Sequence, residues 1–391
     1  MQVYLLIASN DIKSFQVPDL ATVAHLTSVH GRYDTRIFLK ECRSLAAAGH
    51  NVFLVVADGL GDEVRDGVTI CDAGKSRGRI DRMLGATKRV KELGLQLGAD
   101  LYHFHDPEMM PAGLALKRRG KCVVFDAHED LPKQILRKPY LHPAFRRLVS
   151  GSMALYERYA ARRFDMVVAA TPFIRKKFVS LDVRSTDINN FPILGELESD
   201  AGWSSKQREV CYVGGISVIR GAREIVEAIG LSASNARLNL VGRFSDNVLA
   251  TSLKRTSGWR KVNELGLVDR AGVRDILSRS IAGLVTFLPM PNHVDAQPNK
   301  MFEYMSAGIP VIASDFPLWR EIIEGCGCGI CVDPLDPKKI AEAIDYLVDN
   351  PEIARRMGEN GRKAVYDRYN WDVEEKKLLA LYDSLLRENN A

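Results

Sequence analysis

The chain has 391 residues, of which 46% are hydrophobic and 26% charged, and its formal net charge is +5. This composition excludes an intrinsically disordered chain, and the length favours two domains of ordinary α/β size. The net charge is too small to indicate a nucleic-acid partner, so we predict none. No apolar run of the sequence approaches the roughly 20 residues that a membrane-spanning helix needs.

The N-terminal stretch and the cysteines bear on the cellular compartment. The stretch MQVYLLIAS is apolar but short, without a preceding basic residue or a convincing cleavage site, so we do not interpret it as a signal peptide. The seven cysteines are odd in number and scattered, mostly in strand-like apolar runs. This pattern is typical of a reducing environment, and we expect a cytoplasmic protein.

Strand-like and helical segments alternate through the first half of the chain, as in the βαβ units that build a parallel sheet. In the helical segment 34–50, Asp34 can cap the start and Gly49 can end the helix. Residues 1–20 precede the first expected sheet strand and are either an edge strand or an extension. The strands that we expect are 22–28, 51–57, 101–106, 122–128 and 165–171.

Ionisable side chains follow these strands, at the carboxyl ends where ligands of parallel sheets bind. The first strand runs into SVHGRYDTR, and HFHDPE places His105 directly after the third. A buried, hydrogen-bonded histidine is about as common in such a place as an active one, and both interpretations of His105 stay open here. On the loops of this domain we predict a site made of His30, Arg32, Arg36, Asp106 and His128.

Two segments of the first half, 75–91 and 135–164, are strongly basic, and their apolar residues fall at helical spacings. They are either solvated helix faces or a surface that meets anionic lipid or a phosphorylated acceptor.

Turn-forming and polar residues interrupt the pattern at 188–207, and a second series of strands follows. We therefore predict two doubly wound, Rossmann-like α/β domains that face a cleft, over 1–190 and 191–370. The last helical stretch, 371–391, is amphipathic and long enough to cross back and complete the first domain. The strands expected in the second domain are 209–215, 238–243, 282–288, 310–314 and 329–334.

The usual nucleotide fingerprints are absent from the sequence: neither half has G-x-G-x-x-G after an early strand, and no P-loop lysine motif occurs. A nucleotide would need another binding mode. The segment 212–229, YVGGISVIRGAREIVEAI, has a glycine turn at Gly214 and Gly215 and places Arg220 at the start of a helix. Such a cation, together with free helix amides, can neutralise a diphosphate.

The segment 295–314, DAQPNKMFEYMSAGIPVIAS, repeats this design. A proline in the first helical turn leaves the amides of Asn299, Lys300 and Met301 free to bind an anion. Glu303 lies four residues after Asn299 on the same helix face, where its carboxylate can accept both hydrogen bonds of a ribose diol. A capped surface helix would explain this segment if it stood alone. We expect three further side chains to pack on the sheet: Phe302, Met305 and Ser306.

Three of the cysteines form CGCGIC at 326–331. A metal site in this segment needs a fourth ligand at a suitable spacing, and the neighbouring sequence offers none. We interpret the segment as a packed, glycine-rich turn and predict no metal centre.

Together these segments resemble glycosyltransferase family 4, the retaining nucleotide-sugar enzymes of GT-B fold. The resemblance spans roughly 22–389 in order, through VHGRYDTRIFLKECRSLAAAGHNVFLV, HFHDPE, YVGGISVIRGAREIVEAI and PNKMFEYMSAGIPVIASDFP. Family members carry two acidic residues separated by seven others. Asp295 and Glu303 keep this spacing, with aspartate in place of the usual first glutamate. The resemblance implies that the domain over 1–190 binds the acceptor and that over 191–370 binds the nucleotide sugar.

The resemblance also implies individual roles. Glu303 would bind the ribose hydroxyls, Asp295 would face the donor sugar, and His105 would lie beside the transferred sugar. We predict four catalytic residues: His105, Asp295, Arg220 and Lys300. The predicted donor-binding residues are Gly214, Gly215, Arg220, Arg243, Asn299, Lys300, Met301 and Glu303.

One departure from the family concerns the glycine turn. The family commonly has an arginine directly after the glycine of its VG turn and a lysine a few residues later, whereas this chain has Gly215 and Arg220 there. Either Arg243 or Arg36 would then supply the second positive charge. The shorter side chain of Asp295 leaves its reach to the sugar open.

The implied reaction moves a sugar, with retention, from a nucleoside diphosphate, UDP being favoured, to a hydroxyl of a glycan or polyprenyl-diphosphate-linked acceptor in surface polysaccharide synthesis. No Asp-x-Asp motif occurs, so we expect neither a metal nor another cofactor. The basic segments suggest peripheral docking on anionic lipid at the inner face of the cytoplasmic membrane. Two rivals share the fold and nucleotide clamp: a GT-B epimerase acting on a UDP-sugar, and a non-catalytic nucleotide-sugar-binding protein.

Overall fold

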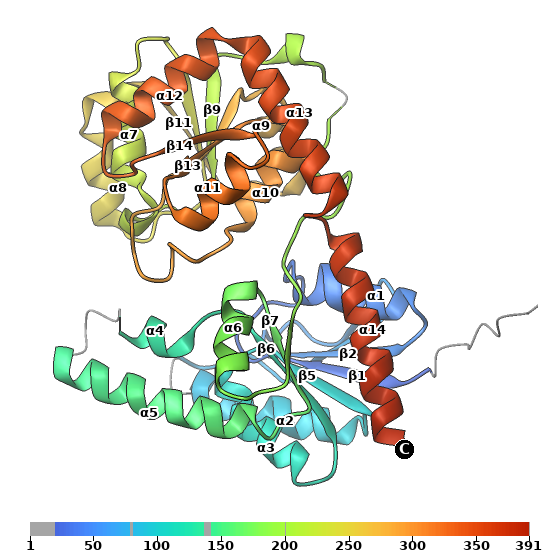
Figure 1. Ribbon diagram of the computed structural model, residues 1–391. Helices are drawn as coiled ribbons and strands as arrows, with labels where there is room; N and C mark the ends of the chain where they lie inside the picture. The colour runs from blue at the N-terminus through green and yellow to red at the C-terminus, as the bar shows by residue number, and fades with distance from the viewer. Residues whose placement is uncertain (1–19, 79–80, 137–141, 200, 391) are drawn as a thin grey trace, which may run out of the picture.

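The computed structural model describes residues 20–78, 81–136, 142–199 and 201–390, and it contains two sheets, each covered by helices on both faces (Figure 1). Whether the start of the chain adds an edge strand lies outside the described residues, apart from Leu20. The division that we expect at residue 190 falls between β8 and η4, in a stretch without helix or strand.

The first sheet has the order β3-β4-β2-β1-β5-β6-β7-β8, and β3 and β4 are its antiparallel pair. All five strands expected in this half are present. β3, β4 and β8 were not expected; β3 and β4 are joined by Asp66 and Gly67, both with positive φ, as in a tight hairpin turn. The strands are β1 (Thr22–Leu26), β2 (Asn51–Val56), β3 (Glu63–Arg65), β4 (Val68–Asp72), β5 (Leu101–Phe104), β6 (Cys122–Ala127), β7 (Met166–Ala169) and β8 (Ser185–Asp187).

The helix expected at 34–50 is present, and its first part is wound as a π-helix. Asp34 caps it by accepting hydrogen bonds from the amides of Arg36 (2.8 Å) and Ile37 (3.0 Å), and Gly49 has a φ of 97° just beyond its end. The helices of this half are η1 (Ile37–Cys42), α1 (Arg43–Ala47), η2 (Asp81–Ala86), α2 (Thr87–Gln96), η3 (Pro107–Met109), α3 (Met110–Lys117), α4 (Leu131–Ile135), α5 (Pro143–Ala161) and α6 (Pro172–Ser180).

The second sheet is parallel throughout, in the order β11-β10-β9-β12-β13-β14. Its five expected strands are present, and β11 is an additional edge strand. The strands are β9 (Glu209–Val213), β10 (Arg237–Val241), β11 (Val262–Gly266), β12 (Ala282–Val285), β13 (Val311–Ser314) and β14 (Gly329–Val332). The helices are η4 (Trp203–Ser205), η5 (Val218–Arg220), α7 (Ala222–Leu231), α8 (Asn247–Lys254), η6 (Ser257–Lys261), α9 (Arg270–Arg279), α10 (Asn299–Ser306), α11 (Pro317–Ile323), α12 (Pro337–Asp349) and α13 (Pro351–Asp367).

The last helix, α14 (Trp371–Asn390), follows α13 and runs down along the N-terminal domain (Figure 1). It packs on the sheet face that carries Val23 and Leu101, and the indole nitrogen of Trp371 donates to the hydroxyl of Ser44 at 2.9 Å. This confirms the expected fold class of two doubly wound α/β domains with a C-terminal helix that crosses back. The apolar residues of α14 in this contact are Leu378, Leu381, Tyr382, Leu385 and Leu386.

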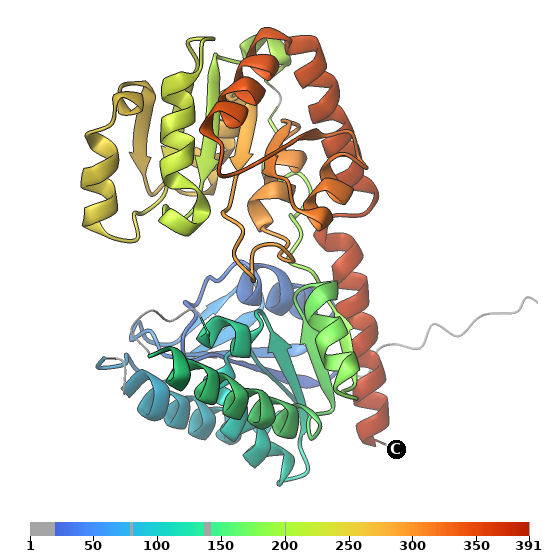
Figure 2. The ribbon, with the colours of Figure 1, turned by 60° about the vertical axis from the view of Figure 1, so that its left-hand side comes forward.

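The strand arrows of the C-terminal sheet point toward the N-terminal domain, and the loop after β12 extends in the same direction (Figure 2). In both sheets the chain reverses its direction of growth next to the first strand, between β1 and β5 and between β9 and β12. Ligands of doubly wound sheets bind at the carboxyl ends of strands at such points. No helix within the described parts of the chain is both long and apolar enough to cross a membrane.

Candidate active site

The C-terminal switch point is built by glycines that allow unusually close packing. Gly221 precedes α7 with a φ of 75°, and a Cβ added to it would lie 2.0 Å from the carbonyl oxygen of Thr286. A side chain is therefore excluded, and the first turn of α7 packs directly on the end of β12. This brings the loop after β9, with Gly214 and Gly215, beside the loop after β12.

Lys300 and Arg220 converge on this glycine turn. The ammonium of Lys300 lies 3.6 Å from the centroid of the Tyr212 ring, and a Cβ on Gly214 would stand 3.0 Å from it. The guanidinium of Arg220 donates to the carbonyl of Gly215 at 3.2 Å, and a Cβ on Gly215 would lie 2.6 Å from it. The glycines therefore leave room for two cations. Arg220 reaches back to the position where the family has its arginine.

The two cations have no anionic partner among the described residues. The Lys300 ammonium is buried and makes no hydrogen bond there. Burial lowers the pKa of Lys300 well below its ordinary value, and the positive charge of Arg220 lowers it further. A buried, unpaired cation next to a second cation is costly, and a bound anion would offset that cost.

The start of α10 only partly matches the expectation. The helix begins at Asn299, and Pro298 precedes it in an extended conformation. The amide of Met301 donates to the carbonyl of Pro298 at 3.0 Å, so the prediction that this amide is free was wrong. The amides of Asn299 and Lys300 make no hydrogen bond within the described residues. As expected, Phe302, Met305 and Ser306 are buried.

Glu303 is partly buried on α10 and is oriented by Arg270, which was not among the predicted site residues. One of its oxygens, Oε1, accepts from Arg270 at 2.8 Å, and Arg270 also donates twice to Glu196, at 2.8 and 2.7 Å. The other oxygen, Oε2, accepts no hydrogen bond from any described residue. Glu303 is thus held at one oxygen, while the other is available to a hydroxyl group.

A signal for Arg270 exists in the sequence. Asp269 accepts a hydrogen bond from the amide of Gly272 at 2.8 Å and so caps α9. Recognising this cap would have placed Arg270 at the carboxyl end of a strand, because the helix start there follows β11 directly.

Arg243 also lies at the carboxyl edge of the C-terminal sheet, after β10. Its side chain is exposed and lines a cavity of about 550 Å³ at the ends of β10 and β11. Gly242 connects this cavity to the glycine turn, because a Cβ on Gly242 would lie 1.9 Å from the carbonyl oxygen of Gly214. The lining residues are Gly242, Arg243, Phe244, Ser245, Asp246, Asn247, Gly266 and Leu267.

Asp295 is half-buried in the loop after β12, which extends toward the N-terminal domain (Figure 2). Among the described residues it has no hydrogen bond or ion pair. The same loop carries two buried acceptors without a partner there, Asn292 Oδ1 and Gln297 Oε1. Polar atoms left without partners in a loop that faces the cleft are consistent with contact to a polar ligand.

At the N-terminal switch point, Asp106 organises the loop after β1. Its Oδ2 accepts from the hydroxyl of Thr27 (2.9 Å) and from the amide of Ser28 (2.5 Å). His30 is partly exposed, with Nε2 at 3.5 Å from Asp106 Oδ1 and Nδ1 at 3.2 Å from Asp34. The hydrogen bond to Asp34 raises the pKa of His30 although burial opposes this.

The sequence-predicted His105 lies behind this surface, and only 1% of it is exposed. Its Nδ1 is 3.0 Å from Asp126 and its Nε2 is 2.9 Å from His25. The imidazole that is partly exposed next to Asp126 is His128, with Nε2 at 2.8 Å from the carboxylate, and its ring lies 5.2 Å from that of His30. Of the two interpretations of His105, the structure has the buried, hydrogen-bonded one.

Arg36, one of the two candidates for the second positive charge, is neutralised by other residues, and so is Arg32 of the predicted N-terminal loop site. Arg32 binds Asp58 through two hydrogen bonds of 2.9 and 2.8 Å and Glu63 through a third. Arg36 is buried and binds Asp126 through two hydrogen bonds of 2.8 Å. Both arginines are neutralised within the N-terminal domain, so neither supplies the second charge for a diphosphate.

Comparisons with known proteins agree with this geometry. A family model described as glycosyltransferase family 4 matches residues 35–190, and one described as glycosyl transferases group 1 matches 196–364. The chain is 31% identical over 302 residues to a phosphatidyl-myo-inositol mannosyltransferase of Mycobacterium leprae, covering 73% of this chain and 74% of the relative. It belongs to glycosyltransferase family 4.

Two further similarities set the limits of this assignment. An alpha-D-kanosaminyltransferase of Streptomyces kanamyceticus is 26% identical over 178 residues, covering 44% of this family 4 chain and 45% of the relative. The solved structure of Alr3699/HepE of Anabaena in complex with UDP-glucose superposes with a TM-score of 0.72 at 14% identity, over 93% of this chain and 100% of that one. The fold is therefore GT-B. The chain spans less than half the length of the first curated relatives it matches.

Proposed function

We propose that this family 4 protein is a retaining glycosyltransferase that moves a sugar from a nucleoside diphosphate, UDP being favoured, to a hydroxyl of a glycan or lipid-linked acceptor. The observation that carries the proposal is the pair of cations without anionic partners, Lys300 and Arg220, at the glycine turn of the C-terminal switch point. The UDP-glucose bound by the Anabaena protein and the phosphatidylinositol named for the mycobacterial relative support the donor and acceptor classes.

The proposed donor position follows from these contacts. The diphosphate lies against Lys300, Arg220 and the free amides at the start of α10, where the helix dipole also favours an anion. The ribose hydroxyls bind the free oxygen of Glu303, and the base enters the cavity beside Arg243. The sugar then lies beside Asp295, in the loop after β12 of the same domain.

The proposed transfer proceeds by front-face attack and needs no metal. The acceptor oxygen attacks the anomeric carbon while the bond from that carbon to the β-phosphate oxygen breaks. The acceptor proton passes to the departing phosphate. Lys300 and Arg220 stabilise the negative charge that develops on this phosphate, a term worth about 10²–10³ in rate for one well-placed donor. His30 and His128, partly exposed on the opposite domain, contact the sugar or the acceptor.

A basic cavity of about 700 Å³ on the N-terminal domain suits a phosphate-bearing acceptor. It lies past the ends of β2 and β4, and exposed Lys75 and Arg77 line it together with Arg89. Arg89 is partly neutralised by Asp81 at 3.2 Å, whereas no ion pair to Lys75 or Arg77 occurs in the described part of the chain. We propose that these two cations receive the diphosphate of a polyprenyl-linked acceptor.

Helix α5 is the proposed membrane-docking element. It projects from the side of the N-terminal domain (Figure 1). Leu148 and Leu155 are 66% and 70% exposed, and Phe145 and Tyr159 extend the same stripe at helical spacing. Exposed arginines flank the stripe, which suits the interface of an anionic bilayer. These arginines are Arg147, Arg158, Arg162 and Arg163.

A donor screen tests the enzymatic proposal. The purified chain is incubated with UDP-, GDP- and dTDP-sugars, and release of nucleotide is measured with and without membrane lipid extract. We expect one donor to be consumed and consumption to rise with the extract. Conversion of the donor to another nucleotide sugar without any acceptor would identify an epimerase instead. Binding without any turnover over the whole screen would contradict a transferase.

Sedimentation with vesicles tests the membrane proposal separately. We expect binding to vesicles containing about a third anionic lipid, weaker binding at 0.5 M salt, and loss of binding in the double variant Leu148→Ser/Leu155→Ser. Equal binding of the variant would exclude α5 as the docking element.

A further inference from the structure

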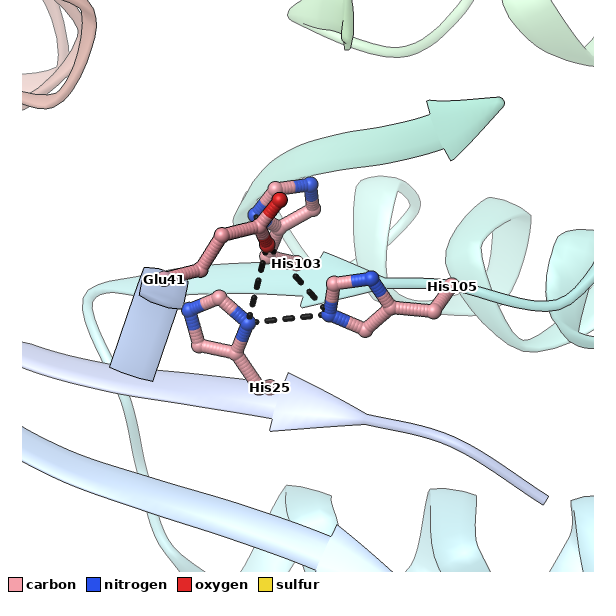
Figure 3. A group of neighbouring side chains, drawn as sticks. All are labelled: His25, Glu41, His103 and His105. Atoms are coloured by element: carbon pink, nitrogen blue, oxygen red, sulfur yellow. Dashed lines mark hydrogen bonds and ion pairs between the residues drawn. The ribbon is translucent and has the colours of Figure 1, made fainter. Parts of the chain in front are cut away.

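A buried cluster of three histidines and a glutamate lies inside the N-terminal domain (Figure 3). His25 on β1 and His103 on β5 are paired in the sheet register, so their side chains lie side by side on one face. His105 follows two residues after His103 and points to the same face. Glu41 comes from η1, which covers this face, and none of the four side chains is exposed.

The four side chains point at a common centre, as Figure 3 shows. His25 Nδ1 lies 2.9 Å from His105 Nε2. Glu41 Oε2 lies 3.8 Å from His25 Nδ1, 3.9 Å from His103 Nδ1 and 4.0 Å from His105 Nε2. Ligand atoms around a tetrahedral zinc ion stand about 3.3 Å apart, given metal–ligand distances of about 2.0–2.1 Å. The separations between ligand atoms given above, 2.9 Å and 3.8 to 4.0 Å, lie on either side of this expected distance.

The carboxylate of Glu41 has an unsatisfied environment. Both of its oxygens are buried and form no hydrogen bond with any described residue. Arg36 Nε forms an ion pair with Glu41 Oε1 at 3.1 Å, but the hydrogen bonds of that guanidinium go to Asp126 and to the carbonyl of Ile188, and Oε2, which faces the histidines, has no cationic partner among the described residues. A buried carboxylate without hydrogen bonds is costly and requires an explanation, such as an ion.

The atoms around the cluster are arranged as they are around metal sites. His105 directs Nε2 to the centre, while its Nδ1 lies 3.0 Å from the carboxylate of Asp126. A carboxylate on the outer nitrogen of a ligating histidine fixes its tautomer and orientation. Two hydrogen bonds from Arg36 hold Asp126 in turn.

We propose that His25, Glu41, His103 and His105 bind one divalent transition-metal ion, with zinc as the expected species. Three neutral imidazoles and one carboxylate are a ligand set that zinc accepts in tetrahedral geometry. Since no ligand is exposed, the ion has no position open to substrate and serves the structure. It joins β1, β5 and η1 at the carboxyl edge of the sheet. The proposal does not rest on the glycosyltransferase activity, and the ion takes no part in the transfer.

A metal-free arrangement of the same residues is the rival. Tyr382 of α14 has its hydroxyl 2.8 Å from His103 Nδ1 and 3.2 Å from His25 Nε2. Without an ion, hydrogen bonds can run from His103 through Tyr382, His25 and His105 to Asp126. With an ion, His103 Nδ1 gives its lone pair to the metal and the bond to Tyr382 is lost. Tyr382 is therefore needed in the rival arrangement and dispensable for metal binding.

Metal content of the full-length chain tests the proposal. After purification without chelator or metal-affinity resin, we expect about one zinc per chain by elemental analysis. Glu41→Gln and His103→Gln should each lower zinc content at least tenfold, while Tyr382→Phe should keep it. Two matched controls should also keep it: His142→Gln on the surface, and His128→Gln, which removes a ligand from the alternative group of His105, Asp126 and His128. Equal zinc content in Glu41→Gln, His103→Gln and the unchanged chain would overturn the proposal.

A second measurement needs no variant, and so does not depend on whether Glu41→Gln or His103→Gln folds. The unchanged chain is dialysed against chelator and titrated with Co²⁺, whose tetrahedral complexes absorb strongly in the visible range. We expect saturation at one equivalent, and a rise in Tm of about 5 °C with Zn²⁺, because the ion binds the folded state selectively. No absorption band and an unchanged Tm would overturn the proposal in favour of the hydrogen-bonded chain.

Discussion

The two sheets share the strand order around their first strand, but their switch points differ in how the charges of the predicted site residues are satisfied. At the N-terminal switch point, Arg32 binds Asp58 and Glu63, and Arg36 binds Asp126. At the C-terminal edge, Lys300 and Arg220 share the glycine turn, and neither forms an ion pair in the described parts of the chain.

This difference separates architecture from ligand binding. Ionisable groups that pair with each other, as Arg36 and Asp126 do, are stabilised little further by a bound ligand of either charge. Groups that are desolvated without partners lower stability until a ligand completes them. Unpaired buried charge lowers the free energy of unfolding, and binding of an anion offsets this loss. This difference supports the proposal that the C-terminal edge is the donor side, and three substitutions and one binding measurement can test it.

Removing the unpaired ammonium should have the largest effect. In Lys300→Met we expect kcat/KM to fall by about 10³, because one preorganised donor to the departing phosphate is lost. At the same time Tm should rise, because a buried charge without a partner is replaced by an apolar side chain of similar length. Steady-state kinetics and thermal unfolding measure the two effects.

The matched control for this substitution is Lys363→Met. Lys363 is exposed on α13 and pairs with Asp367 at 2.6 Å, so neither activity nor Tm should change by more than a small amount. If Lys300→Met lowered both activity and Tm, the ammonium would be a structural group, and the contrast between the two edges would fail.

Glu303→Ala should have the next largest effect, mainly on the KM of the donor. Loss of a charge-assisted hydrogen bond to the ribose costs about 1.5–3 kcal/mol, so KM should rise by about 10–100-fold while kcat changes less. Initial rates at varied donor concentration measure the split. Glu196→Gln is the control, since it also loosens Arg270 but leaves Glu303 in place. A rise in KM of equal size in both variants would show that Arg270, not Glu303, carries the effect.

Much of the donor edge could be predicted from the sequence, because its signals are local. Gly214, Gly215 and Arg220 lie within seven residues of one another, and Glu303 shares a helix turn with Asn299. Helix and strand periodicity is sufficient to place such groups. Two of the strands that were not predicted illustrate different reasons. β11 has the sequence VNELG, which is too polar for a buried strand, and β3 has only three residues, although the Asp66-Gly67 turn marks its hairpin.

The buried histidine cluster could not be predicted in the same way, because its members are far apart in the sequence. His25 and His103 meet only through the register of β1 and β5, and Glu41 arrives on a helix whose π-helical winding was not foreseen. Short spacing makes metal ligands recognisable in a sequence, as for the cysteines at 326–331, and the buried cluster has no such spacing. The sequence does contain one signal. His25 follows Val23 by two residues and His103 follows Leu101 by two, so each histidine shares a strand face with an apolar residue that packs against α14.

On the N-terminal edge, His128→Gln should lower kcat by about tenfold and leave the KM of the donor nearly unchanged. The imidazole is partly exposed beside His30 and is held near Asp126, and in the proposed mechanism it contacts the reacting sugar or the acceptor after the donor is bound. Single-turnover rates measure the effect, and His142→Gln on the far surface is the control. A change in donor KM with unchanged kcat would move His128 from the acceptor side to the donor site.

The smallest expected effect is the uptake of up to one proton when UDP binds, and measuring it tests the donor edge without requiring any loss of activity. Burial and Arg220 lower the pKa of Lys300 in the free protein, and a bound diphosphate should raise it again toward its ordinary value. Between these two pKa values the complex holds more protons than the free protein. Binding of UDP at a pH between them should therefore take up as much as one proton, and affinity should fall as pH rises through this window.

Calorimetry in two buffers of different ionisation enthalpy measures this uptake. The difference between the two observed enthalpies gives the number of protons, and Lys300→Met should reduce it to the value set by the nucleotide alone. Equal uptake in the variant and the unchanged chain would place the proton elsewhere. In that case the diphosphate does not reach the ammonium, and Lys300 would be as structural as Arg32 and Arg36 at the N-terminal switch point.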